Sequence, residues 1–185
     1  MDKKIAVIVG SLRKGSLNRK LAQALKSLCP PSKTMQLIEI GDLPLYNQDL
    51  EDSEHVPEAW STFRQQMSTC DAVLFITPEY NRSIPGPLKN AIDVGSRPYG
   101  QSIWNNKPSA IISVSPGAIG GFGANQHLRQ SLSCLNVPLL PQPEAYIGQA
   151  ESLFNEQGEL LKQDSNKFFK SFMETFCHWL DIHVA

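Results

Sequence analysis

The chain has 185 residues, 41% of them hydrophobic, which is enough for one domain, residues 1–185, with a substantial core. Its 17 basic and 18 acidic residues leave a formal net charge of -1, so charge gives no case for binding nucleic acid or an anionic membrane. The longest apolar runs, Ile5–Val9 and Ala72–Ile76, are far too short to span a bilayer, and no signal peptide is expected.

Apolar, β-branched runs alternate along the chain with longer amphipathic segments, as in βαβ units. The runs predict strands at Lys4–Val9, Met35–Ile40, Ala72–Thr77, Ala110–Ser115 and, as the weakest signal, Glu144–Ile147. The amphipathic segments predict helices at Asn18–Leu28, Pro57–Thr69, Pro87–Gly95, Asn125–Leu135 and Ser165–Ile182. This pattern fits an α/β, flavodoxin-like three-layer sandwich, with a five-stranded parallel sheet in the order 2-1-3-4-5. A ligand would then bind at the carboxyl ends of the first, third and fourth strands.

The stretch GSLRKGSLN joins the first predicted strand to the first predicted helix. A turn of this kind presents helix N-terminal amides, which bind phosphate. It is not a P-loop, because Ser16 stands where the lysine is required, and it is not a dinucleotide fingerprint, because Leu12 replaces the second glycine. The polar groups of Ser11, Arg13, Ser16 and Asn18 suit a single phosphate monoester. A polar turn capped by Ser16 or Asn18 is the alternative.

Two further loops follow the third and fourth predicted strands and are expected at the same edge of the sheet. They read TPEYNRSIPGPLKN, residues 77–90, and SPGAIGGFGA, residues 115–124. Both are rich in residues that expose backbone amides or permit unusual dihedral angles. Glycines in the second of them leave main chain bare, so a flat ring system could approach it: Gly117, Gly120, Gly121 and Gly123. A flexible connection is the alternative reading of this second loop.

Other polar residues give weaker signals. Four cysteines without a C-x-x-C pair favour buried free thiols and a reducing compartment, the cytoplasm. Glu79 and Asp93 could form an acid and base pair, but no nucleophile accompanies them, so capping or surface roles are favoured. His127 is the one histidine near a ligand loop, and no spacing resembles a metal site. Tyr99 and Trp104 could line an acceptor pocket or a subunit contact, with surface packing as the alternative. We therefore predict no catalytic side chain and no metal.

The segments GSLRKGSLN, TPEYNRSIPGPLKNAID and GAIGGFGANQHLRQSL, with LPLYNQDLE before the second helix, resemble the NADPH-dependent FMN reductase family. Within it, the likeness is to the bacterial chromate and quinone reductases and related azoreductases. It runs over residues 3–182, and its first two motifs are specific as a pair. The resemblance implies a flavodoxin-like fold, bound FMN and electron transfer from NADPH or NADH to a small-molecule acceptor such as a quinone, an azo compound, chromate or free flavin.

The resemblance also implies site residues. Those similar to the family's phosphate-binding residues are Ser11, Arg13, Ser16, Leu17 and Asn18. Those similar to the segment along the isoalloxazine ring are Pro78, Glu79, Tyr80 and Asn81. Those similar to the third wall of the site are Ser115, Gly120 and Gly121.

The resemblance further implies a homodimer, in which one subunit helps to wall the flavin site of the other. A monomer would expose the apolar side chains of the segment LPLYNQDL: Leu43, Leu45, Tyr46 and Leu50. Gly123 and Gln126 stand where some relatives carry an arginine and a tyrosine used between subunits, so a tetramer built on those contacts is less favoured.

One open ring face would serve both NAD(P)H and the acceptor, which predicts two-electron, ping-pong kinetics. A flavodoxin-type one-electron carrier is the alternative. Such carriers are usually strongly acidic, and a net charge of -1 argues against that reading.

Overall fold

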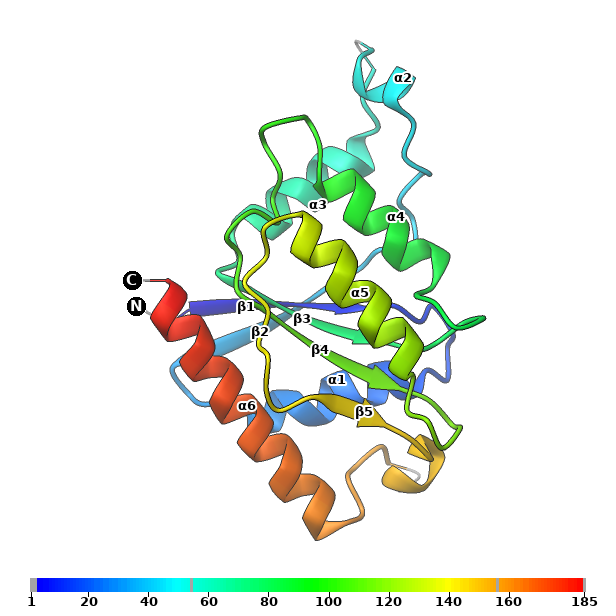
Figure 1. Ribbon diagram of the computed structural model, residues 1–185, viewed down its shortest axis with the longest axis vertical. Helices are drawn as coiled ribbons and strands as arrows, with labels where there is room; N and C mark the ends of the chain where they lie inside the picture. Colours follow the sequence, from blue (N-terminus) through cyan, green and yellow to red (C-terminus); the bar gives the residue numbers. More distant parts are fainter. Residues whose placement is uncertain (1–2, 54, 156, 185) are drawn as a thin grey trace.

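The computed structural model describes residues 3–53, 55–155 and 157–184 (Figure 1). Its centre is a five-stranded sheet in the order β2-β1-β3-β4-β5, with every neighbouring pair parallel. The strands are β1 (Lys3–Val9), β2 (Lys33–Ile38), β3 (Ala72–Thr77), β4 (Ser109–Val114) and β5 (Ala145–Ile147). The predicted flavodoxin-like sheet and its strand order are therefore confirmed.

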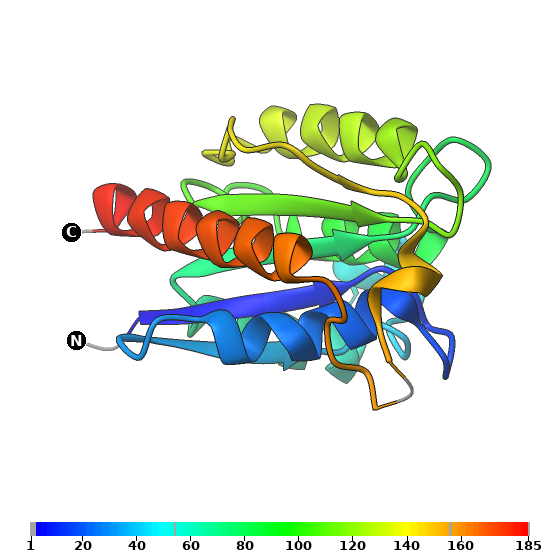
Figure 2. The ribbon, with the colours of Figure 1, turned by 90° about the horizontal axis from the view of Figure 1, so that it is seen from below.

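Helices cover both faces of the sheet (Figure 2). The helices are α1 (Leu17–Leu28), α2 (Gln48–Glu51), α3 (Glu58–Ser68), α4 (Gly86–Gly95), α5 (Phe122–Cys134) and α6 (Gln163–His183). Helices α1 and α6 lie on one face, and α3, α4 and α5 lie on the other. The short α2 and a 3-10 turn at Ala150–Leu153 were not predicted from the sequence. No helix of the residues that the structure describes is both long and apolar enough to cross a bilayer.

The central strands are buried because both of their faces are covered. Along β1, Ile5 and Val7 point into the core beneath α1 and α6, while Ala6 and Ile8 point into the core beneath α3, α4 and α5. This alternation explains why the sequence runs are continuously apolar. The aromatic stripe of α6 packs into the first core, as Phe172 illustrates at 1% exposure. Each such buried side chain contributes roughly 1.5–3 kcal/mol.

Most element boundaries differ from the predictions by one or two residues, and two elements show the larger shifts. Strand β2 begins and ends two residues earlier than Met35–Ile40. Helix α5 begins at Phe122, three residues before the predicted Asn125, with Gly121 as its N-cap at a left-handed φ of 75°. Glycines have low helix propensity, so GGFGA resembles a loop in the sequence. Its helical start depends on a contact from another loop, described below.

Trp104 and part of the segment LPLYNQDL are placed differently from the predictions. Trp104 is fully buried, and its Nε1 donates to the Ile92 carbonyl at 2.9 Å, so it belongs to the core and lines no acceptor pocket. In the segment LPLYNQDL, Leu45 is 79% exposed, whereas Tyr46 is half-buried and stacks on Trp60 at a centroid distance of 5.4 Å. The segment is therefore only partly exposed in one chain.

All four cysteines are free, as predicted. Cys70 and Cys177 are buried and Cys29 is half-buried, but Cys134 is exposed, so burial of every thiol was wrong. Cys134 is the last residue of helix α5.

Candidate functional site

The three loops that follow β1, β3 and β4 meet at the carboxyl edge of the sheet, as the parallel register requires. Gly10 is where the first and second of these loops touch. Its N–H donates to the Ile76 carbonyl at 2.9 Å, and a Cβ there would lie 3.1 Å from Thr77 Oγ1 and 3.2 Å from Pro78 Cδ. A side chain at this position would press the loops apart, so glycine permits the close approach.

The first loop ends in a helix cap made from its own sequence. Ser16 is buried, and its Oγ accepts a hydrogen bond from the Arg19 N–H at 3.2 Å. Its carbonyl accepts from the Lys20 N–H at 3.0 Å. Of the two predicted caps, Ser16 is therefore the one the structure uses, while the amides of Leu17 and Asn18 keep the outward position of helix N-terminal donors.

The first loop also holds polar groups with no partner in the part of the chain that the structure describes. Asn18 is 4% exposed, and its Oδ1 is buried without a hydrogen-bond partner. Arg13 and Lys14 are exposed and form no ion pair within that same part. An orphaned buried amide oxygen is unfavourable in an isolated protein. The exposed cations can donate to an anion and so suit an external phosphate, whereas the Asn18 amide oxygen is an acceptor and cannot bond one.

The second loop folds into a tight two-residue turn. Tyr80 and Ser83 exchange two backbone hydrogen bonds of 3.0 Å each, and the residues between them have positive φ, 51° for Asn81 and 65° for Arg82. Pro78 before the turn is buried, whereas Tyr80 remains 42% exposed at the rim. The turn therefore presents a fixed backbone surface and one exposed aromatic ring at the edge of the sheet.

The Glu79 side chain bridges the second and third loops. Its carboxylate accepts a hydrogen bond from the Ala124 N–H in the first turn of α5, at 3.1 Å, and pairs with Arg82 Nη1 at 3.1 Å. Gly123 makes room for this contact, because a Cβ there would lie 2.9 Å from Glu79 Oε2 and 2.9 Å from the Arg82 carbonyl oxygen. The carboxylate thus caps α5, which has no side-chain cap from its own N-cap residue.

The glycines of the third loop serve packing within the protein. A Cβ at Gly120, whose φ is 67°, would lie 2.5 Å from the Tyr146 carbonyl carbon, and one at Gly121 would lie 3.0 Å from Ser113 Cβ. Both missing side chains would face the sheet, so close packing requires glycine at these two positions. Ser115 Oγ accepts from the Gly117 N–H at 3.1 Å and so shapes the loop itself.

Exposed apolar side chains surround this edge on all three loops. They are Leu12 at 48% exposure, Tyr80 at 42%, Ile119 at 59% and Phe122 at 50%. Phe122 also packs against Tyr146 at a centroid distance of 5.2 Å. Sequence reasoning named Tyr80 but missed the other three, because an isolated apolar residue in a loop carries no periodicity. Their grouping suits a flat, largely apolar ligand or a partner surface.

The remaining candidates form no second catalytic site. Asp93 pairs with Lys89 at 2.8 Å, so the suggested acid and base pair of Glu79 and Asp93 has each member bound elsewhere. His127 Nδ1 lies 3.1 Å from Ser83 Oγ on the exposed side of α5. Among residues 3–53, 55–155 and 157–184, no group of three or more His, Cys, Asp and Glu could hold a metal ion.

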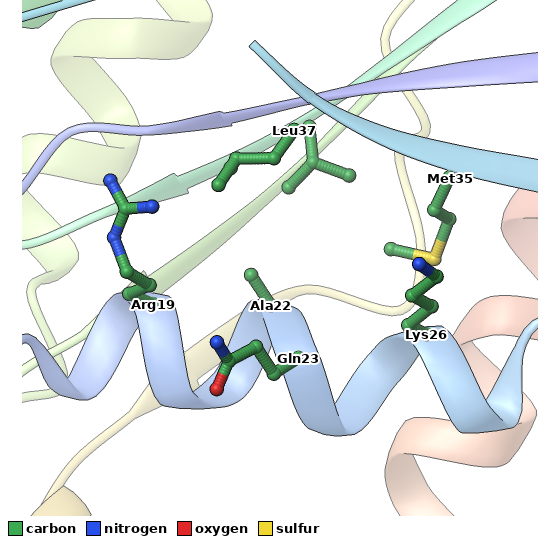
Figure 3. Close-up of a pocket in the computed structure, with 7 residues that line it drawn as sticks. Arg19, Ala22, Gln23, Lys26, Met35 and Leu37 are labelled. Carbon is green, nitrogen blue, oxygen red and sulfur yellow. The ribbon is translucent and has the colours of Figure 1, made fainter. Parts of the chain in front are cut away.

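Figure 3 shows a hollow of about 150 Å³ between α1 and the edge strand β2. Its lining residues come from neither the second nor the third loop: Val7, Arg19, Ala22, Gln23, Lys26, Met35 and Leu37. The cation nearest the first loop, Arg19, is already held by Glu39 through two bonds of 2.7 Å. We therefore assign the candidate cofactor site to the strand ends and not to this hollow.

The sheet order and the helices on both of its faces define a flavodoxin-like α/β protein, a fold whose ligands bind at the carboxyl edge of the sheet. A family model for NADPH-dependent FMN reductases matches residues 3–152, and the chain belongs to that family. The predicted resemblance, the oxidoreductase class and the use of FMN with a nicotinamide donor are thereby confirmed.

Individual relatives agree with the family assignment. The chain is 58% identical over 181 residues to a quinone reductase of Pseudomonas putida, covering 98% of this chain and 96% of that protein. It is 48% identical over 180 residues to a 2-hydroxy-1,4-benzoquinone reductase of a Burkholderia species, covering 97% of each. Among solved structures, FerB of Paracoccus denitrificans, a flavoenzyme NAD(P)H:(acceptor) oxidoreductase, superposes with a TM-score of 0.90 at 44% identity and 98% coverage of both chains.

Proposed function

We propose that this chain is an NAD(P)H-dependent quinone reductase that holds FMN at the carboxyl edge of its sheet and works by a ping-pong mechanism. The observation that carries the proposal is the convergence of three loops on one edge. The α1 N-terminus and Arg13, which has no ion-pair partner among the described residues, bring positive charge there, and four apolar side chains are exposed beside it. Bound FMN supplies the redox chemistry, since its ring can accept an electron pair from NAD(P)H and give it up to an acceptor.

Each loop has a proposed role in holding the cofactor. The groups proposed to hold the phosphate are Ser11, Arg13, Ser16, Leu17 and Asn18. Their support is the first-turn amides of α1 and the exposed guanidinium of Arg13, which are donors. The backbone of Pro78, Glu79, Tyr80 and Asn81 is proposed to border the ring, and Ser115, Gly120 and Gly121 to form the wall opposite. The Glu79 side chain holds this wall in place through Ala124, so its part in binding is indirect.

Quinones are the proposed acceptors, because relatives at 58% and 48% identity are named for quinone reduction. Azo compounds, chromate and free flavin are proposed as further acceptors. A shallow, apolar edge would select an acceptor by its reduction potential and planarity more than by specific hydrogen bonds.

Initial-rate kinetics test the mechanism. With the FMN-loaded protein, NADPH is varied at several fixed concentrations of 1,4-benzoquinone, and the double-reciprocal lines are expected to be parallel. Intersecting lines would contradict a shared binding face. Negligible NADPH and NADH oxidation with every quinone tried would reject the reductase and leave the one-electron carrier. Flavin released by heat and separated by chromatography is expected to be FMN, and finding FAD would contradict the phosphate site.

A homodimer is part of the proposal. Helix α2 and the segment before it project from the body of the chain (Figure 1), and Leu45 on that segment is 79% exposed. Leu50 follows at 38% exposure, and Phe122 on the α5 start is 50% exposed. Burying these side chains would favour association. Light scattering at micromolar concentration is expected to give about twice the 20.5 kDa of one chain, and a monomer mass would contradict it.

We also propose that the protein works in the cytoplasm. Four free cysteines support this location, since free thiols persist in a reducing compartment. Recovery of the protein mainly in a periplasmic or secreted fraction would contradict it.

A further inference from the structure

Two cysteines meet on the face of the sheet covered by α1 and α6, away from the three loops. Cys29 is the C-cap of α1, and Cys177 lies in the last two turns of α6. The two helices run side by side, and their C-terminal ends lie toward the edge where the chain termini emerge (Figure 2). Cys29 packs against the core cluster that contains Cys177, and Lys33 joins the two segments: its carbonyl oxygen lies 3.8 Å from Cys29 Sγ, and its ammonium group pairs at 3.0 Å with Asp181, one helical turn after Cys177.

The surroundings of this thiol pair are charged. The Lys33 side chain is 7% exposed and pairs with Asp181 at 3.0 Å, and Lys3 pairs with the same carboxylate at 3.3 Å. The Cys29 thiol also points at the Lys33 carbonyl oxygen, with an S···O distance of 3.8 Å. A buried ammonium group beside a thiol favours its thiolate form, which is the nucleophile in thiol chemistry.

The two cysteines differ in ways that suit two different roles. The neighbouring Cys177 thiol lowers the pKa of Cys29, burial opposes this, and the Lys33 charge favours it. The neighbouring Cys29, together with burial, raises the pKa of Cys177 well above its usual value. Cys29 is also half-buried whereas Cys177 is 5% exposed, so a small oxidant reaches Cys29 first. A low-pKa, accessible thiol beside a second thiol is the arrangement of redox-sensing cysteines.

We propose that Cys29 and Cys177 form an oxidation site that reacts with hydrogen peroxide and closes to a disulfide between α1 and α6. The Cys29 thiolate attacks one peroxide oxygen, so that an S–O bond forms, the O–O bond breaks, and the departing hydroxide takes a proton to become water. The Cys177 sulfur then attacks the Cys29 sulfur, the S–S bond forms, and the hydroxyl leaves as water with the Cys177 proton. Two thiols lose two electrons in total, and one peroxide becomes two waters.

Peptide mapping tests the proposal on the FMN-loaded full chain. The protein is treated with one equivalent of hydrogen peroxide, free thiols are alkylated, and a tryptic digest is analysed without reduction. The expected product joins residues 27–33 to residues 171–185, with a mass lower by two hydrogen atoms than the sum of the two peptides. Recovery of both peptides fully alkylated, or a disulfide formed chiefly by Cys134, would overturn the proposal.

Two variants serve as controls. Cys134→Ser removes the exposed thiol that has no neighbouring cysteine on α5, and it is expected to leave the product unchanged. Cys177→Ser is expected to stop the reaction at the sulfenic acid of Cys29, trapped by dimedone, and to increase labelling severalfold over wild type. If Cys29 is labelled equally in wild type and Cys177→Ser, the second thiol does not resolve the first and the proposal fails. Because quinone reduction is not the readout, this outcome is independent of the proposed function.

Discussion

Helices α1 and α5 both begin at the carboxyl edge of the sheet, yet their first turns are completed in different ways. Helix α1 is capped by its own Ser16, and no carboxylate of the described chain bonds to its first-turn amides. The N-cap of helix α5 is Gly121, which provides no side-chain cap. Instead the carboxylate of Glu79, 45 residues away in the sequence, accepts a hydrogen bond from the Ala124 N–H. One N-terminus is thus left for an outside anion and the other is filled from within.

The difference shows that a helix N-terminus is a phosphate site only when the protein does not already neutralise it. The dipole of either helix is equivalent to roughly half a positive charge at its start. At α5 this charge meets Glu79, whose side chain is only 11% exposed, so screening by water is weak. At α1 the charge adds to that of Arg13, which has no ion-pair partner in the described chain. The comparison therefore supports α1, and not α5, as the proposed position of the FMN phosphate.

Removing the free arginine gives the largest expected effect. Arg13→Ala is expected to weaken FMN binding about ten- to a hundredfold, because a charged hydrogen bond is worth ~1.5–3 kcal/mol and each tenfold step is ~1.4 kcal/mol. Fluorescence titration of the apoprotein with FMN measures it. The free energy of unfolding of the apoprotein should not change, since Arg13 is exposed and unpaired there.

Lys14→Ala is the matched control for Arg13→Ala, because the neighbouring lysine is also exposed in the same loop. We expect it to weaken FMN binding less than Arg13→Ala does. If Lys14 proves the more important of the two, the orientation of the first loop is wrong.

Removing the Glu79 carboxylate tests how much this cap stabilises helix α5. Glu79→Ala is expected to lower the free energy of unfolding of the apoprotein by about 2 kcal/mol, since it removes a charged hydrogen bond to Ala124 in a largely buried place. Urea unfolding without FMN measures it. Glu79→Gln keeps an acceptor oxygen and should recover about half of the loss.

Arg82→Gln separates the cap from the ion pair. The Arg82 side chain is 73% exposed, so its loss should cost less than ~0.5 kcal/mol. An apoprotein that is as sensitive to Arg82→Gln as to Glu79→Ala would show that the ion pair, and not the α5 cap, is what stabilises this corner.

The same comparison separates what could be predicted from the sequence from what could not. The apolar runs of β1, β3 and β4 predicted the sheet because doubly covered strands have few other compositions. The α1 cap could also be predicted, since Ser16 lies only three residues before Arg19, whose N–H donates to its Oγ. The start of α5 was not, because its stabilising partner Glu79 is distant in the chain and glycines around it indicate a loop. Long-range contacts therefore account for both the shifted boundary and the unexpected role of Glu79.

A smaller effect is expected from Ser16, the N-cap of α1, and variants at this position can separate helix capping from FMN binding. Ser16→Ala is expected to cost about 1 kcal/mol of unfolding free energy, as loss of an N-cap does. Ser27→Ala, which removes a serine hydroxyl bonded to the Ala24 carbonyl near the other end of α1, should cost less.

Ser16→Asp keeps a capping oxygen but places a negative charge at the proposed position of the FMN phosphate. It should therefore retain apoprotein stability and lose FMN binding, and tight FMN binding to this variant would contradict the site.

The smallest expected effect concerns Arg19, the second cation at the start of α1. Glu39 binds its guanidinium through two bonds of 2.7 Å, so its charge is already neutralised. Arg19→Ala should accordingly weaken FMN binding less than about threefold, or under ~0.7 kcal/mol. An effect equal to that of Arg13→Ala would show that pairing within the protein does not decide which cation meets the phosphate.

The Arg19–Glu39 pair also makes a prediction about pH. The hydrogen bond from Arg19 lowers the pKa of the Glu39 carboxyl, against the opposing effect of partial burial. A carboxyl whose folded pKa is depressed stabilises the fold above its unfolded pKa of about 4.3, and the contribution is lost as pH falls through the folded value. Because the two side chains are 31% and 62% exposed, the gain at pH 7 should be only a few tenths of a kcal/mol. Glu39→Gln should therefore differ from wild type by that amount in urea unfolding at pH 7 and match it by about pH 3. A difference that persists in acid would assign the effect to packing of the side chain and not to its charge.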